Sequence, residues 1–421
     1  MRRIAQSIAR FQAPMWLLVP LLALMLLLGF GGGYVAAIRL TSPCPESREV
    51  CAKFANFWKA WDIAEANYVD PSALDPARMT DGAIEGMLDS LGDRGHTRYL
   101  SAETAKAERE SLAGKFEGIG AYIDVRDDQP MIVQPIEGSP AERAGIQPGD
   151  LILKVDGEDV RGVTIDQLRA KVRGPKGSQV RLTLRHAGTE GSYEVTITRA
   201  EINVPAVSWR MLADRVAYIK LVQFSSPSSE QMKQALSDAQ AQGARAIVLD
   251  LRNNPGGLVN ELVEIASQFL PKDTTVLLEQ NRNGERTPYK TREGGVALTI
   301  PLVVLVNNNT ASSAEILAGA LKEAGRATVI GTPTYGTATV LRPFDLDGGA
   351  QLRLGTTQWL TPNGEVVRNK GIEPNEKVEL PPDARPLSPV EAAKLSAAEL
   401  SSISDTQLAR ALGILGELAR R

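Results

Sequence analysis

The stretch Pro301–Leu321, PLVVLVNNNTASSAEILAGAL, decides the fold. It opens with an unbroken apolar run, Leu302–Val306, and then changes at Asn307 to a short polar turn. An apolar run of this length predicts a strand that is buried on both faces. The small and apolar residues that follow predict a helix over Ser313–Ala324. The stretch therefore predicts a strand that leads directly into a helix.

The same alternation of strands and helices extends in both directions from about Trp209 onward. The other predicted strands are VAYIKL (216–221), AIVLDL (246–251) and ATVI (327–330), and the other predicted helices cover Ser229–Ala241 and Leu258–Leu270. Such alternation is typical of a sheet whose strands are buried and partly parallel. We therefore predict a βα-layered core.

The region from Gly114 to about Ala200 is rich in short strand signals instead. These are GIGAYIDV, PMIVQPI, DLILKVDG, QVRLTL and YEVTIT, with one predicted helix over Ile165–Val172. Glycines at 118 and 120 allow successive backbone N–H groups to face an anion, and the strand after them offers an edge to an extended peptide. The alternative interpretation of these glycines is an ordinary tight turn. A nucleotide loop is excluded because no βαβ unit follows.

The residues from Lys53 to Leu100 predict a small helical region. Its first apolar stripe comprises Phe54, Phe57, Trp58, Trp61 and Ile63. His96 follows in the sequence LGDRGHTRYL, and we interpret it as a structural histidine that hydrogen-bonds a turn, because no acidic or nucleophilic partner is placed beside it.

The N-terminus predicts a membrane anchor. Met15–Ile38 contains 24 residues without a charge. At about 1.5 Å per residue this helix is about 36 Å long, enough to cross a hydrocarbon core of about 30 Å. Arg2, Arg3 and Arg10 precede the span, which favours a cytoplasmic N-terminus and an extracytoplasmic main body. A cleaved signal peptide is the alternative, but its apolar region is usually shorter, so we predict a single-pass cell-membrane protein.

Composition excludes several function classes. A net charge of −3 and a pI near 5.8 provide no basic surface for nucleic acid. With two histidines and two cysteines, the chain has too few ligands for a clustered His/Cys metal site, so no metal or cofactor is predicted. Cys44 and Cys51 lie just beyond the anchor, where a disulfide and two free thiols are both compatible with the sequence.

Ser312 and Ser313 are the candidate nucleophiles. A serine on a sharp turn from strand to helix exposes its hydroxyl beside the amides of the helix N-terminus. The alternative interpretation is a helix cap, which is the common role of serine at this position.

The segment GSPAERAGIQPGDLILKVDGEDVRG, 138–162, resembles the PDZ family. The preceding loop Phe116–Gly120 stands where PDZ domains bind a terminal carboxylate. The resemblance implies that polypeptide C-terminal tails are the partner, and that Gly118, Ile119, Gly120 and Ala121 form the peptide-binding site.

The chain from about Lys53 to Leu380 resembles the C-terminal processing peptidases, also called tail-specific proteases. The matching pieces occur in the family's order and are GMLDSLGDRGHTRYL, the PDZ segment, DLRNNPGGL, NTASSAEILAGALKEAGRA, VIGTPTYG and LTPNGEVVRNKGIEPN. The resemblance implies that Ser312 is the nucleophile of a serine-type endopeptidase. It also implies that Ser313 and Gly257 donate the oxyanion amides.

The same resemblance places Thr337, 25 residues after Ser312, where the family has its general-base lysine. Leu341 replaces a glutamine of the family pattern. Lys322 is too far along the helix to act as a base, at about 15 Å from Ser312, whereas Lys370 and Lys290 stay open. A pseudopeptidase that serves as a peptide-binding scaffold is therefore the alternative function.

These observations predict a mixed α+β chain with an anchor helix, a helical region, a PDZ-like β-rich module and a βα-layered serine-peptidase core. The predicted segments are a cytoplasmic stub and transmembrane anchor at 1–40, an N-terminal helical region at 41–113, the PDZ-like domain at 114–200, the peptidase core at 201–385 and a C-terminal helical tail at 386–421.

Overall fold

The computed structural model describes residues 47–93, 96–126, 128–136, 138–186 and 188–418. The predicted membrane span Met15–Ile38 and Cys44 lie outside these residues. Within the described ranges, no helix combines the length and the apolar character needed to cross a membrane. The chain divides into two compact units, Met1–Thr80 and Asp81–Arg421.

The described part of the first unit is helical. It contains α2 (Arg48–Asn67), the short 3₁₀ helix η1 (Pro71–Ala73) and the start of α3 (Pro76–Asp89). The predicted helix is present, but its aromatic stripe is not covered: no residue of α2 is buried, and Phe54 and Trp58 are 45% and 51% exposed. Cys51 is disulfide-bonded, so the free-thiol alternative is wrong for this residue.

The PDZ-like module is an antiparallel sheet with one main helix. Its strands are β3 (Ala121–Arg126), β4 (Gln129–Pro135), β5 (Leu151–Val155), β6 (Glu158–Asp159), β7 (Gln179–Arg185) and β8 (Ser192–Thr198). The order β3-β4-β5-β7-β8 leaves β3 at one end of the sheet. The helices are α5 (Pro140–Arg143) and α6 (Ile165–Val172), the latter at the predicted position. A two-stranded ribbon of β2 (Lys115–Gly118) and β9 (Ala200–Asn203) connects the module to the rest of its unit.

The core is built on a six-stranded sheet in the order β10-β11-β12-β15-β16-β19. Its strands are β10 (Val207–Met211), β11 (Val216–Leu221), β12 (Ala246–Asp250), β15 (Leu302–Val306), β16 (Thr328–Gly331) and β19 (Glu376–Lys377). All neighbours from β11 to β19 are parallel, and only β10 is antiparallel to its partner. The predicted buried, partly parallel sheet is confirmed.

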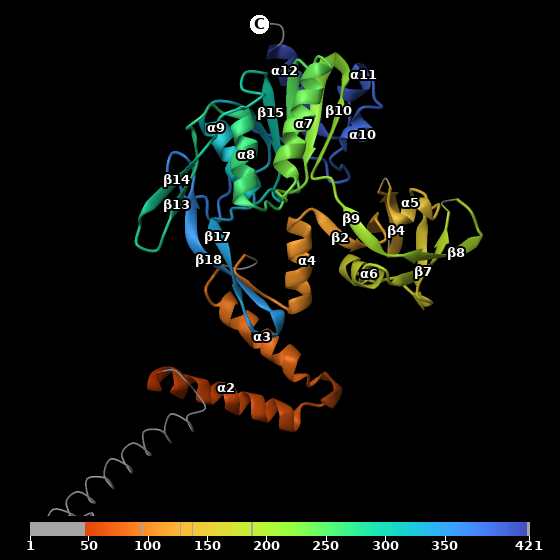
Figure 1. The fold of residues 1–421 in the computed structure, drawn as a ribbon, viewed down its shortest axis with the longest axis vertical. Coiled ribbons are helices and arrows are strands. Elements are labelled where there is room, and N and C mark those ends of the chain that lie inside the picture. The colour runs from red at the N-terminus through yellow and green to blue at the C-terminus, as the bar shows by residue number, and fades with distance from the viewer. Residues whose placement is uncertain (1–46, 94–95, 127, 137, 187, 419–421) are drawn as a thin grey trace, which may run out of the picture. The chain divides into compact units, whose positions relative to one another are not determined.

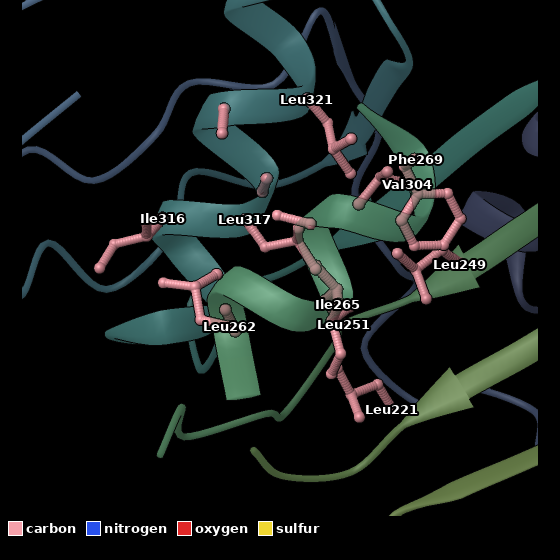
Figure 2. Close-up of a cluster of buried hydrophobic side chains, with 14 of the residues drawn as sticks. Leu221, Leu249, Leu251, Leu262, Ile265, Phe269, Val304, Ile316, Leu317 and Leu321 are labelled. Atoms are coloured by element: carbon pink, nitrogen blue, oxygen red, sulfur yellow. The ribbon is translucent and has the colours of Figure 1, made fainter. Parts of the chain in front are cut away.

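Helices cover both faces of this sheet (Figure 1). One face packs against α7 (Ser228–Ala241), α8 (Val259–Phe269) and α9 (Ser313–Glu323), and the other against α10 (Pro389–Ala392), α11 (Ala397–Leu400) and α12 (Thr406–Leu418). Figure 2 shows the first of these layers, in which Leu249 and Val304 of the sheet lie beside Phe269 of α8. Burial on both faces explains why the strands are apolar without a break.

A second, antiparallel sheet flanks the core. Its strands are β1 (Arg98–Leu100), β13 (Thr275–Gln280), β14 (Arg286–Lys290), β17 (Thr339–Asp345) and β18 (Gln351–Leu360). The remaining elements are α4 (Ala102–Leu112) and the short 3₁₀ helices η2 (Ala213–Arg215) and η3 (Asp347–Gly349). β1 pairs with β18, with Arg98 opposite Arg353. This pairing brings the end of the N-terminal helical region to the peptidase core.

A buried ionic cluster attaches the C-terminal helices to the sheet. The fully buried Arg252 follows β12, and its guanidinium contacts Asp250 at 2.9 Å and Asp405, just before α12, at 2.7 Å. Tyr218 donates a hydrogen bond of 2.7 Å to the Asp250 carboxylate. Arg252 of this cluster lies two residues before Asn254 in the sequence, at the start of the loop that reaches the candidate site.

Candidate active site

Ser312 lies at the turn between β15 and α9 and has an unusual backbone conformation. α9 begins at Ser313, so Ser312 is the residue that precedes the helix. Its φ of 53° and ψ of −125° cost a non-glycine residue about 1 to 3 kcal/mol, and such strain is typical of functional sites. The sharp turn is the geometry that exposes a nucleophilic hydroxyl beside helix amides.

Hydrogen bonds join the turn that carries this serine to a neighbouring loop. The Thr310 hydroxyl donates to the Leu251 carbonyl at 2.9 Å, and the Ala311 N–H donates to the Asn254 carbonyl at 2.9 Å. Asn254 is buried, and its side-chain oxygen accepts the N–H of Gly256 at 2.9 Å. The two segments therefore form one hydrogen-bonded unit.

The glycine pair lies directly against the serine pair. A Cβ on Gly256, whose φ is 94°, would lie 2.7 Å from the Cβ of Ser312, so only glycine fits there. The Ser313 hydroxyl donates to the Gly257 carbonyl at 2.9 Å. Among the described residues, none accepts a hydrogen bond from the N–H of Gly257 or of Ser313. Two backbone amides without a partner beside a serine are suited to stabilising an oxyanion.

The buried carboxylate of Glu315 holds the loop that faces the serine. Its Oε1 accepts the Gly336 N–H at 2.6 Å, and its Oε2 accepts the N–H and the hydroxyl of Thr337 at 3.0 and 2.6 Å. The same Oε2 accepts the Ser312 N–H at 2.9 Å. Glu315 thus connects Thr337, which stands where the resemblance implies a general base, to Ser312, the expected nucleophile. This role of Glu315 was not identified from the sequence.

Thr337 occupies the predicted position of the general base. Its Oγ1 lies 2.7 Å from the backbone nitrogen of Ser312, from which it accepts a hydrogen bond. Thr337 and Ser312 are therefore in contact. A threonine hydroxyl is a poor proton acceptor at neutral pH, and here its own proton goes to Glu315, so Thr337 orders the backbone at this position.

A cavity of about 610 Å³ opens in front of these residues. Its lining includes Ser312, Gly256, Gly257, Thr337, Leu341 and His96. Of the described residues, no lysine lines it. Lys322 donates to the Glu373 carbonyl at 2.7 Å, while Lys370 and Lys290 are exposed and do not line the cavity. None of the three lysines considered from the sequence faces this cavity.

A second cavity, of about 660 Å³, lies between β3 and α6. Gly118, Ile119 and Ala121, which the PDZ resemblance assigns to a peptide site, line it. Gly120 does not; with a φ of 79°, it packs so tightly that a Cβ would lie 2.3 Å from that of Ser139. Because β3 ends the sheet, its free edge can pair with an extended peptide.

Basic side chains of α6 and the residue that follows it also line this peptide groove. Arg169 and Arg173 are among the lining residues, and the Arg173 guanidinium lies 5.2 Å from the centre of the Phe116 ring. Burial lowers the pKa of Arg173, and the neighbouring Arg169 adds to the effect. These cations are suited to a terminal carboxylate, and they were not identified from the sequence.

Comparison with known proteins agrees with this geometry. The family model "Peptidase family S41" matches residues 215–378, and a PDZ domain model matches residues 131–186. The carboxy-terminal processing protease CtpA of Bacillus subtilis is 37% identical over 334 residues, which cover 79% of this chain and 71% of the relative. The chain belongs to the C-terminal processing proteases of peptidase family S41. It is a serine-type member of that family with a PDZ domain.

Two further proteins are similar to this chain. The carboxyl-terminal-processing protease of a Synechocystis species is 38% identical over 361 residues, which cover 84% of this chain and 81% of the relative. A solved S41-type structure from Bacteroides fragilis has a TM-score of 0.54 and 20% identity, covering 79% of this chain and 90% of that one. The likeness to this solved structure supports the fold of the core and the PDZ-like module.

Proposed function

We propose that this C-terminal processing protease is a membrane-anchored endopeptidase that captures a polypeptide tail in its PDZ groove and cleaves the polypeptide with Ser312. One observation carries this proposal. The strained Ser312 lies against the glycine pair and precedes the free amide of Ser313, in a cavity large enough for a peptide. This arrangement favours acyl transfer and is not needed for a helix cap.

In the proposed reaction, Ser312 Oγ attacks the scissile carbonyl carbon. An acyl-enzyme forms as the C–N bond breaks, and the C-terminal fragment leaves as an amine that carries the proton from the serine hydroxyl. The N–H groups of Gly257 and Ser313 donate hydrogen bonds to the oxygen that becomes negative. Because both are held in place by the backbone, they need little reorganisation as the charge develops. Water then hydrolyses the acyl-enzyme and regenerates the serine.

The PDZ groove is proposed to supply substrate selection. The tail adds a strand to the edge of β3, and its carboxylate binds near Gly118–Gly120 beside Arg173. Main-chain pairing recognises any extended peptide, so the terminal carboxylate provides the selectivity for chain ends.

The anchor is proposed from the charge-free span Met15–Ile38 and the arginines before it. The body of the protein then lies outside the cytoplasmic membrane. A reporter fused after Leu380 that is active only in the cytoplasm should stay inactive; activity of that reporter would contradict the orientation.

A peptide-binding scaffold without proteolysis is the second candidate function. The observation that favours it is Thr337, whose hydroxyl is engaged with Glu315 in place of a basic amine. This candidate keeps the PDZ groove and its ligand but assigns no chemistry to Ser312.

One experiment separates the two functions. The purified protein is incubated with an unfolded polypeptide that ends in an apolar tail with a free carboxylate, and fragments are identified by mass spectrometry. The endopeptidase produces fragments, and Ser312→Ala and C-terminal amidation of the substrate each reduce them. Tail binding without any Ser312-dependent fragment would favour the scaffold.

A further inference from the structure

His96 lines the same cavity as Ser312. Its backbone N–H donates to the Asp93 carbonyl at 3.2 Å, so the turn expected from the sequence is present. β1 follows it and pairs with β18, which places the imidazole in the cavity. A role in the turn accounts for the backbone of His96 but not for the position of its imidazole.

The hydrogen bonds of the imidazole determine which nitrogen carries the proton. His96 Nδ1 contacts the Thr339 hydroxyl, and the Thr339 hydroxyl lies 3.1 Å from the Asp93 carboxylate. A carboxylate only accepts, so the single hydroxyl proton of Thr339 goes to Asp93. Thr339 must then accept a proton from Nδ1. This network leaves Nε2 without a proton, as a general base requires.

The surroundings of this imidazole favour its neutral form. Burial lowers the pKa of His96, Asp93 opposes this effect, and Arg98 adds to it. The charged side chains around the site are Asp93, Arg98, Glu108, Arg353 and Arg368. Glu108 contacts Arg98 at 2.6 Å and Arg353 at 3.3 Å, while Arg368 lies 3.8 Å from Asp93. A neutral imidazole at pH 7 is able to accept a proton.

The other histidine of the chain has a different environment. His186 Nδ1 lies 2.6 Å from the buried Asp150 carboxylate, and its ring stacks on Tyr193 in the PDZ module. It does not line the Ser312 cavity. His186 therefore offers a matched control for histidine substitution.

We propose that His96 is the general base for Ser312, in place of the lysine that Thr337 replaces. Nε2 takes the proton from Ser312 Oγ as Oγ bonds to the scissile carbonyl carbon. It returns that proton to the amide nitrogen when the C–N bond breaks. Nε2 then takes a proton from the attacking water and returns it to Ser312 Oγ as the acyl ester breaks. Thr339 is a positioning residue that holds the tautomer.

This inference rests on the proposed function, because it requires Ser312 to be a nucleophile. The test measures kcat/KM against pH for an unfolded polypeptide, using the full chain. Wild type should gain activity as the pH rises through a value at or below about 6.5, and then keep it. His96→Asn retains an amide donor to Thr339 but has no Nε2, so it should lose about 10²- to 10⁴-fold. His186→Asn should keep the pH dependence of wild type.

The outcomes separate the two claims. If Ser312→Ala is inactive while His96→Asn keeps wild-type activity and pH dependence, the base assignment is overturned and the proposed function stands. If wild type shows no Ser312-dependent cleavage, both are overturned.

A second measurement does not depend on activity or on the folding of the His96 variant. Nitrogen-15 NMR of the imidazoles in wild type should show the Nδ1–H tautomer for His96, and Thr339→Val should weaken that preference. In the separate activity assay, Thr339→Val should lower kcat more than it changes KM. An Nε2–H tautomer in wild type would overturn the proposal.

Discussion

The backbone N–H of Ser312 donates a hydrogen bond of 2.7 Å to the hydroxyl of Thr337. The candidate nucleophile and the position of the missing base are therefore in direct contact, and Glu315 accepts hydrogen bonds from both. The loop that carries Thr337 lies against Ser312, and Thr337 has a hydroxyl in place of an amine. Ser312 lies beside the glycine pair and the Ser313 amide, so the source of the base is what separates the proposed protease from the proposed scaffold.

Replacing Thr337 tests this position directly. Thr337→Lys would place an amine in the cavity within reach of the Glu315 carboxylate. A neighbouring carboxylate raises the pKa of an amine, so the neutral, basic form increases only as the pH becomes alkaline. We expect added Ser312-dependent cleavage that grows with pH, whereas Thr337→Met should add none. Equal rates for the two folded variants at every pH would contradict this expectation.

Because Gly256 lies so close to Ser312, we expect that one methyl group added to Gly256 strongly reduces the cleavage rate. Gly256→Ala would force the serine turn to move, and a misplacement of about 1 Å can reduce the rate about 10²-fold. Gly284 has a similar φ of 85° but open space around it, so Gly284→Ala should cost only about 1 kcal/mol of backbone strain. Cleavage rates and thermal unfolding of both variants check this, and equal effects on cleavage would contradict it.

A matched glycine pair also tests the peptide groove. A Cβ on Gly120 would lie 2.3 Å from the Ser139 Cβ, whereas one on Gly138 meets nothing within 4 Å. Gly120→Ala should weaken binding of a free-carboxylate tail peptide by about tenfold, the effect of about 1.4 kcal/mol, and Gly138→Ala should not. Fluorescence anisotropy with a labelled peptide measures both. Unchanged affinity of the Gly120→Ala variant for the peptide would show that this loop is not part of the peptide site.

The buried ionic cluster predicts an acid-sensitive fold. Burial would raise the pKa of Asp250, but Arg252 and Lys220 outweigh it and hold that pKa below its ordinary value. Because the pKa of Asp250 is lower in the folded state than in the unfolded state, its ionised form stabilises the fold. This stabilisation is complete above the unfolded-state pKa of about 3.9 and is lost as the pH falls from that value through the folded-state pKa. Asp250→Asn should flatten this acid limb of the free energy of unfolding, and an unchanged limb would exclude Asp250 as its source.

The partner carboxylate in this cluster gives a second variant. Asp405→Ala leaves part of the buried Arg252 charge uncompensated and should lower the free energy of unfolding at pH 7 by about 3 to 5 kcal/mol. Asp383 is exposed, and Asp383→Ala should stay within about 0.5 kcal/mol of wild type. Urea denaturation of the two variants checks the difference.

Local patterns predicted the parts of the structure that depend on neighbouring residues. The apolar run Leu302–Val306 became β15, and the helix expected from Ser313 became α9. Both of these features follow from periodicity. The family resemblance placed Thr337 near Ser312, and the two residues are in contact.

Other features depend on contacts between distant residues and could not be predicted in this way. β1 pairs with β18 across about 250 residues, and His96, which lies just before β1, lines the cavity. Glu315 follows a pattern expected of a helix cap, and nothing in the sequence shows that its carboxylate also binds Gly336 and Thr337. The α2 stripe predicted a packed face, but periodicity does not specify what covers it.

The central claim is that Ser312 is an activated nucleophile, and labelling with a fluorophosphonate tests it most directly because this reagent needs an activated serine. Wild-type protein is incubated with the reagent, and the adduct is located by intact mass and peptide mapping. We predict one adduct on the peptide that contains Ser312, and none in a folded Ser312→Ala variant. A folded wild-type protein that takes up no label at Ser312 would contradict the account.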